Sequence, residues 1–110
     1  MSESNMIRTT TRREVTFAGS DTSNAISING FSAGLWLELP ASFSGTAVTF
    51  LSVDENENDL EVYKAGSAVT VAVDAGKINR LPADDLFGLA KIKIVSDAIE
   101  TLTATLLCTA

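Results

Sequence analysis

The segment TAVTFLSVDENENDLEVYK, residues 46–64, carries the clearest indication of fold in the chain. In its first half Val48 and Phe50 fall on one face, with the period of two that is typical of a β-strand. The second half, DLEVYK, alternates in the same way, and the polar run DENEND between the two halves favours a turn. The segment therefore predicts two adjacent strands joined by a short loop.

The same alternation recurs on both sides of this pair of strands. Further segments place apolar residues at every second position: residues 15–17, 26–28, 35–39, 69–73, 91–95 and 102–108. Turn-forming stretches separate them, and only LPADDLFGL, residues 81–89, fits a helical turn. Eight or nine short strands at a spacing of about ten residues are typical of an antiparallel β-sandwich, most often a jelly roll. We therefore expect an all-β, jelly-roll-like sandwich domain over residues 14–110, preceded by an extended and flexible N-terminal arm over residues 1–13.

The composition limits the classes of function. A chain of 110 residues, 45% of them hydrophobic, is expected to fold as one domain with its own core. No apolar run approaches the roughly 20 residues that span a bilayer, and the first residues lack the apolar core of a signal peptide. We therefore expect a protein made in a cytoplasm, with no membrane partner.

The absence of histidine bears on catalysis and metal binding. It removes the commonest general base and a common metal ligand. Cys108 is the single cysteine, so no disulfide can form within the chain, and we expect it to be buried as a small hydrophobic residue. These features predict a non-enzymatic protein with no catalytic residue, no cofactor and no metal site.

Charge is distributed unevenly along the chain. The net charge is −6, yet residues 1–13 carry Arg8, Arg12 and Arg13 against a single Glu3. The acidic remainder repels phosphate backbones, so nucleic acid is not expected as a partner of the folded domain. The basic arm is suited to an acidic partner surface or to nucleic acid, which makes its three arginines candidate partner-binding residues. A frayed chain end is the alternative interpretation.

The acidic run DENEND raises the question of a calcium site. Calcium prefers about six to eight oxygen ligands, and the run begins with the alternate spacing of an EF-hand loop. The match then fails, because Asp59 occupies the sixth position, where Gly is needed, and Ala65 occupies the twelfth, where Glu is needed. We interpret the run as the solvated tip of a hairpin. A looser calcium site on the carboxylates of Asp54, Glu57 and Asp59 is the alternative.

Trp36 is the only tryptophan in the chain. It lies opposite Leu35 and Leu37 in its predicted strand, and period two does not decide which side faces the core. An outward tryptophan can stack on a sugar ring or anchor a protein contact, so Trp36 is a candidate partner-binding residue. We nevertheless expect Trp36 to be buried, with the leucines facing a second layer or a neighbouring subunit.

A series of motifs covers residues 31–96. A leucine-rich strand ends in Pro40, and FSGTAVTF, the acidic loop DENEND, GSAVTVAVDAG and LPADDLFGLAKIK follow in that order. In this order the motifs resemble small β-sandwich proteins encoded among the head and neck genes of tailed bacteriophages and prophages. The matched residues are core and turn positions, so the resemblance implies a fold and no catalytic residue. It also implies a virion component, of the capsid decoration or head-to-tail neck and collar type, whose partners are phage capsid or neck proteins.

Two functions of different classes fit the sequence. The first is a structural virion protein that acts through protein–protein assembly. Strands with apolar or threonine side chains on both faces favour a homo-oligomer, for which a trimer is our expectation. The alternative is a carbohydrate-binding β-sandwich module for host attachment, which needs an exposed aromatic platform. One Trp, one Tyr and five Phe offer few residues for such a platform.

Overall fold

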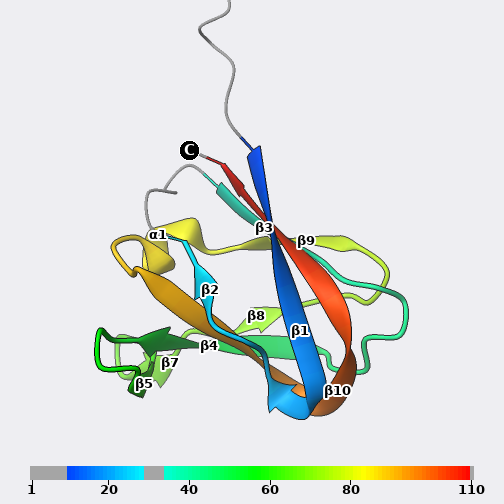
Figure 1. Ribbon diagram of the computed structural model, residues 1–110, viewed down its shortest axis with the longest axis horizontal. Coiled ribbons are helices and arrows are strands. Elements are labelled where there is room, and N and C mark those ends of the chain that lie inside the picture. The colour runs from blue at the N-terminus through cyan, green and yellow to red at the C-terminus, as the bar shows by residue number, and fades with distance from the viewer. Residues whose placement is uncertain (1–9, 29–33, 110) are drawn as a thin grey trace, which may run out of the picture.

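A computed structural model describes residues 10–28 and 34–109, which form an all-β antiparallel fold (Figure 1). The strands in chain order are β1 (Thr10–Thr22), β2 (Ile26–Ser27), β3 (Gly34–Glu38), β4 (Ala47–Val53), β5 (Asp59–Glu61), β6 (Tyr63–Lys64), β7 (Ser67–Ala68), β8 (Val71–Ala72), β9 (Ile78–Leu81) and β10 (Lys91–Thr109). One short helix, α1 (Ala83–Leu86), precedes β10. The all-β antiparallel architecture that the sequence predicts is confirmed.

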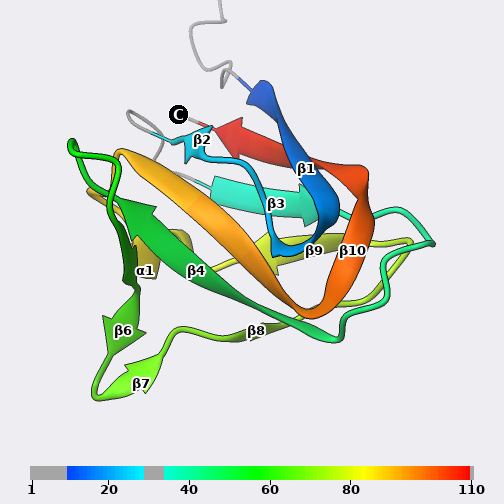
Figure 2. The same cartoon turned by 60° about the horizontal axis from the view of Figure 1, so that its bottom comes forward.

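The longest strand, β10, is the centre of the main sheet. Its first half pairs with β4 over residues 91–96, and its second half pairs with β3 over residues 105–109. β1 runs along the other edge of the second half (Figure 2). Even-numbered side chains of β10 are buried or half-buried from Ile92 to Cys108. Because this alternation is uninterrupted, a single strand can pair with β4 in its first half and with β3 in its second half.

The number and length of the strands differ from the prediction of eight or nine short strands. The described residues contain ten strands, and two of them are long, with 13 residues in β1 and 19 in β10. The predicted segments 91–95 and 102–108 are parts of one strand, because the alternation continues in phase through the polar residues Ser96 and Glu100. The sheet order β5-β4-β10-β3-β9, with β1 and β2 also paired to β10, does not confirm a jelly roll.

A bend in β10 carries the strand from one layer of the sandwich to the other (Figures 1 and 2). Opposite the bend, the register of β1 shifts between Ala18 and Ser20 and again between Ser20 and Thr22. Gly19 lies within this irregular stretch with a φ of 69°, a conformation that glycine adopts without steric cost. Such bulges increase local twist, which lets the sheet fold over on itself and enclose a core.

The core lies between the two layers. The largest fully buried side chains include Phe17, Phe50, Leu37, Ile94 and Leu106, which come from both halves of the sheet. The ring of Phe17 meets that of Phe43 edge-on, with the centroids 6.0 Å apart. Cys108 is also fully buried, as expected, and burial raises the pKa of its thiol.

The prediction that Trp36 is buried is wrong. Its neighbours Leu35, Leu37 and Leu39 face the core, and 37% of the Trp36 surface remains exposed on the outer side of the sheet. Three leucines on one face bury more apolar surface than the single indole opposite them, so their face turns inward.

The predicted boundary of the N-terminal arm at residue 13 also needs correction. β1 begins at Thr10, and Arg12 and Arg13 lie opposite Leu107 and Leu106 of β10. Arg13 lies on the same face as Val15 and Arg12 on the opposite face, so the alternation of the strand continues through both residues. The rest of the predicted arm lies outside the described residues.

The helical turn that the sequence predicts within residues 81–89 is confirmed as α1. Pro82 stands at its start, where a missing backbone N–H costs nothing. Gly88 follows it with a φ of 92°. In the ranges that the structure describes, no helix has the length and apolarity needed to cross a membrane.

Candidate functional site

The outer side of the sheet formed by β1, β10, β3 and β9 presents an exposed surface with an apolar centre. The strand register brings side chains from four distant segments together there. We call this surface the Trp36 face and define it by Thr10, Arg12, Glu14, Trp36, Glu38, Ile78, Arg80, Thr105, Leu107 and Thr109.

Two adjacent cross-strand rows make up most of the Trp36 face. In the first row, Arg12 lies opposite Leu107, Leu107 opposite Trp36, and Trp36 opposite Arg80. The second row has the order Glu14, Thr105, Glu38 and Ile78 across the same strands. The first row therefore has a positively charged residue at each end, and the second row contains two negatively charged residues.

A shallow hollow of about 400 Å³ lies over the first row and over residues on either side of that row. Its lining consists of Thr10, Trp36, Ile78, Leu107 and Thr109. Ile78 is 50% exposed although it belongs to a strand. The hollow has the apolar centre and polar surroundings that are typical of a protein-contact surface.

Weak contacts hold the charged residues of the Trp36 face. The Arg80 guanidinium carbon lies 5.9 Å from the centroid of the Trp36 ring, a cation–π contact. Arg12 Nη1 lies 3.6 Å from Glu38 Oε1, and both side chains are more than half exposed. An exposed ion pair of this kind contributes at most about 1 kcal/mol. Both arginines can therefore change partner at little cost.

The structure separates the four candidate partner-binding residues. Arg12 and Trp36 share the Trp36 face, two strands apart in the same row. Arg13 points to the opposite side of the sheet, where it is half-buried and close enough to Cys108 to affect its pKa. Arg8 lies outside the described residues. Ile78 and Arg80 were missed from the sequence, because their place on this face depends on the pairing of β9 with β3.

The acidic run DENEND forms the tip of the β4–β5 hairpin, so the hairpin interpretation is confirmed. Val53 pairs with Asp59, and the Asp54 carboxylate accepts hydrogen bonds of 2.8 Å from the backbone N–H groups of Asn56 and Asn58. The bond from the Asn58 backbone is the main cause that lowers the pKa of Asp54. Within residues 10–28 and 34–109, no group of three or more His, Cys, Asp or Glu side chains is arranged to hold a metal ion.

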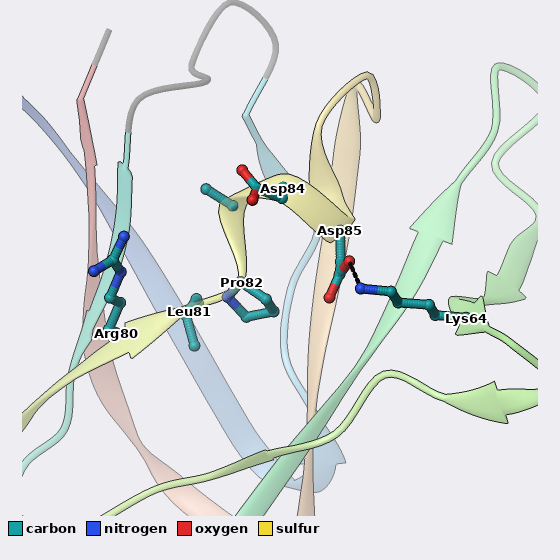
Figure 3. Close-up of a pocket in the computed structure, with 7 residues that line it drawn as sticks. Lys64, Arg80, Leu81, Pro82, Asp84 and Asp85 are labelled. Carbon is teal, nitrogen blue, oxygen red and sulfur yellow. Dashed lines mark ion pairs between the residues drawn. The ribbon is translucent and has the colours of Figure 1, made fainter.

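A second, smaller hollow of about 180 Å³ lies beside α1 (Figure 3). The Lys64 ammonium group forms an ion pair of 3.0 Å with Asp85. Asp84, the neighbouring carboxylate, points in a different direction in Figure 3. Asp85, and not Asp84, therefore pairs with the Lys64 cation at this hollow.

The bend of β10 contains a buried carboxylate that the sequence did not reveal. Glu100 is only 2% exposed, and its oxygens accept hydrogen bonds from the backbone N–H groups of Ser44 and Gly45 and from the hydroxyls of Ser44 and Ser96. Burial by itself would raise the pKa of Glu100, but these hydrogen bonds outweigh it and lower the pKa. Because donors from the protein itself occupy these acceptor sites, the Glu100 carboxylate holds the loop that contains Ser44 in place.

The same loop makes a second carboxylate contact at the surface. Asp97 accepts hydrogen bonds of 2.9 Å from the backbone N–H and the hydroxyl of Thr46. The backbone bond is the main cause that lowers the pKa of Asp97. The motif FSGT, residues 43–46, is therefore attached to the bend in β10 through its hydrogen bonds to Asp97 and Glu100.

Comparison with known proteins shows a likeness of fold. No protein-family model and no curated protein matches the chain. Among solved structures, the chain is similar to the crystal structure of the SPBc2 prophage-derived protein YomS, with a TM-score of 0.61 and 16% sequence identity. The match covers 96% of this chain and 96% of that chain. A likeness at this identity shows a shared fold, and the protein that shares it is of prophage origin.

Proposed function

We propose that this chain is a non-enzymatic structural virion protein of a tailed bacteriophage. It acts through protein–protein assembly as a capsid decoration or a head-to-tail neck and collar component. The observation that carries the proposal is the Trp36 face, an apolar hollow on an otherwise well-paired sheet. The prophage origin of a full-length structural neighbour and the motif resemblance to phage head and neck proteins support it.

The chemistry of the Trp36 face suits a protein partner. Trp36, Ile78 and Leu107 supply apolar surface at the centre, and tryptophan and arginine are the residues most enriched in binding hot spots. The threonines of β10 around them are short and β-branched, so they lose little conformational freedom when covered. A rigid sheet that presents such a surface can bind without the cost of reordering its backbone.

The proposal includes partners and location. The partners are phage capsid or neck proteins, the protein is itself a homo-oligomer with a trimer favoured, and it is located in the virion after synthesis in the host cytoplasm. Arg12 and Trp36 contribute to the partner surface from the Trp36 face. Arg8 and Arg13 stay candidate residues on the basis of the sequence.

Incorporation into particles tests this function. A phage that lacks the gene would be complemented with a tagged copy, and purified particles would be analysed by quantitative mass spectrometry. We expect a fixed, symmetry-related number of copies per particle. The Trp36→Ala variant should lower that number at least tenfold, whereas Ile99→Ala, which removes another exposed apolar side chain, should leave it unchanged. Particles free of the wild-type protein would refute the proposal.

The carbohydrate-binding alternative gains one observation, which is that Trp36 is exposed as that function requires. The Arg80 guanidinium near the ring competes with a sugar for the same aromatic surface. Because Trp36 is the only tryptophan, its fluorescence reports directly on binding. A shift in its emission on titration with host-surface glycans would favour this alternative, and an unchanged spectrum at millimolar glycan would eliminate it.

A further inference from the structure

We propose that the outer face of the β1-β10-β3-β9 sheet, centred on Trp36, is the contact surface between copies of this chain. This inference rests on the proposed function and names the first partner in the assembly. Two properties of the face support it, its apolar centre and its charge balance, and its size sets the expected strength of the contact.

The apolar centre provides the attraction. Trp36 and Ile78 are two of the six exposed large hydrophobic residues among those described, and they lie in neighbouring rows of adjacent strands. Leu107 joins them to line one hollow. Burial of such side chains contributes about 25 cal/mol for each Å² removed from water. If a second copy placed its own Trp36 and Ile78 against this region, the hollow of each copy would be covered by the other copy.

The charge balance indicates which partner fits. The chain carries a net charge of −6, so two copies repel each other over most of their surfaces. The Trp36 face is the exception, because Arg12 and Arg80 balance Glu14 and Glu38. Its Arg and Glu side chains stand in adjacent rows, so a copy that lies with its Arg row over the Glu row of its neighbour pairs opposite charges. Self-contact therefore costs less electrostatic energy here than on the acidic remainder of the molecule.

The size of the face sets the expected strength of the contact. The face covers four strands and five residues along β10, Thr105–Thr109, so its flat area is roughly 19 by 17 Å. That area is less than half of the roughly 800 Å² that each partner contributes to a standard interface. We therefore expect an association that depends on protein concentration, with a Kd on the order of micromolar to tens of micromolar.

The test is the native mass of the full chain, measured by light scattering on a size-exclusion column. Samples would span concentrations from about 1 µM to 1 mM, which bracket the expected Kd. Two variants are compared with the wild type: Ile78→Asp places a charge in the Trp36 face, and Ile99→Asp places the same charge at a 72% exposed isoleucine of the β10 bend. Both positions are exposed, so circular dichroism should show that both variants fold.

The inference predicts three results. The wild type rises from the monomer mass of 11.6 kDa to twice that mass as concentration increases, because a face that meets its own copy closes a symmetric dimer in place of the trimer expected from the sequence. The Ile99→Asp variant does the same, whereas Ile78→Asp remains monomeric at concentrations at least tenfold higher. A wild type that stays monomeric at 1 mM, or an Ile78→Asp variant that associates like the wild type, would overturn the inference.

The outcome can be separated from that of the proposed function. A monomeric protein that still enters particles would refute self-contact and leave the virion role in place. An oligomer that is absent from particles would refute the virion role and leave the self-contact surface in place. A monomer whose Trp36 fluorescence responds to glycan would instead assign the face to a sugar and overturn the inference.

Discussion

The carboxylate of Glu100 accepts a hydrogen bond of 2.8 Å from the backbone N–H of Gly45, a residue 55 positions earlier in the chain. Glu100 sits in the bend of β10, and Gly45 belongs to the loop that leads into β4. The contact therefore ties the bend of the central strand to the start of its neighbour. Hydrogen bonds from Ser44 and Ser96 to the same carboxylate complete the attachment.

Replacement of the Glu100 carboxylate should destabilise the fold. Glu100→Gln keeps the shape of the side chain but loses the charge and gives up acceptor sites, which leaves buried N–H or hydroxyl groups without a partner. Hydrogen bonds to charged groups are each worth about 1.5–3 kcal/mol, so we expect the free energy of unfolding to fall by about 2–3 kcal/mol. Urea unfolding at pH 7 measures this change. The exposed Glu61→Gln is the matched control, and equal stability of the two variants would contradict the role of Glu100.

A methyl group at Gly45 should be poorly tolerated. A Cβ at this position would collide with the Ser96 hydroxyl and lie 2.6 Å from Asp97 Oδ1. Because Ser96 is bound to Glu100, it cannot move without breaking the carboxylate contacts. We expect Gly45→Ala to lower Tm by roughly 10 °C, which corresponds to about 2 kcal/mol in a domain of this size. Ser42→Ala, at an exposed position in the same loop, should change Tm little, and calorimetry that finds both variants equally stable would contradict the steric argument.

Stability should fall in acid because of Glu100. Its pKa in the folded protein is lowered from the ordinary value of 4.5, so its contribution to stability is fully present above that value. The contribution is lost as pH falls below 4.5 and through the folded-state pKa. Urea midpoints between pH 7 and pH 3 should therefore drop most steeply below pH 4.5 for the wild type. The decline should be shallower for Glu100→Gln, and parallel curves for the two proteins would rule out this source of the pH dependence.

Loss of the Arg80 side chain should expose Trp36. The guanidinium lies 5.9 Å from the ring centroid, and an exposed cation–π contact contributes about 0.5–1 kcal/mol. We expect Arg80→Ala to increase acrylamide quenching of the single tryptophan and to lower the free energy of unfolding by no more than about 1 kcal/mol. Lys77→Ala, which removes a cation from an exposed position just before β9, should leave quenching unchanged. Quenching that does not respond to Arg80→Ala would show that the contact is absent in solution.

Deletions at the N-terminus should locate the edge of the folded domain. Because β1 begins at Thr10, a deletion of residues 1–9 should leave Tm within a few degrees of the full chain. A deletion of residues 1–13 also removes the pairing of Thr10, Arg12 and Arg13 with β10, and it should lower Tm clearly further. Thermal unfolding of the two truncated proteins measures the difference. Identical Tm values would show that the first four residues of β1, residues 10–13, contribute nothing to stability.

Local patterns in the sequence predicted the local structure well. The β4–β5 hairpin and the turn of α1 each depend on residues close in sequence, and both were correctly anticipated. The continuity of β10 was not, because Ser96 and Glu100 look like a polar interruption until their partner loop is known. The orientation of Trp36 was also missed, since period two distinguishes the faces of a strand but does not assign the inner one.

The candidate site could be predicted only in part. Trp36 and Arg12 attracted notice as an isolated aromatic residue and as a cation in a basic segment. Their closeness depends on the pairing of β1 and β3 with opposite edges of β10, which no spacing in the sequence encodes. Ile78 and Arg80 enter the face through β9 alone. Long-range register is the information that single-sequence patterns lack.

The central place of β10 has a consequence for the order of events during synthesis. β1, β2, β3 and β4 all emerge before β10, yet each of them finds its pairing partner in that strand. Until it has been translated, these segments present unpaired edges and apolar faces to the cell, a condition that favours chaperone binding or aggregation. Contacts between segments so distant in sequence also slow the search for the native arrangement. We therefore expect the sheet to assemble only after β10 has been synthesised.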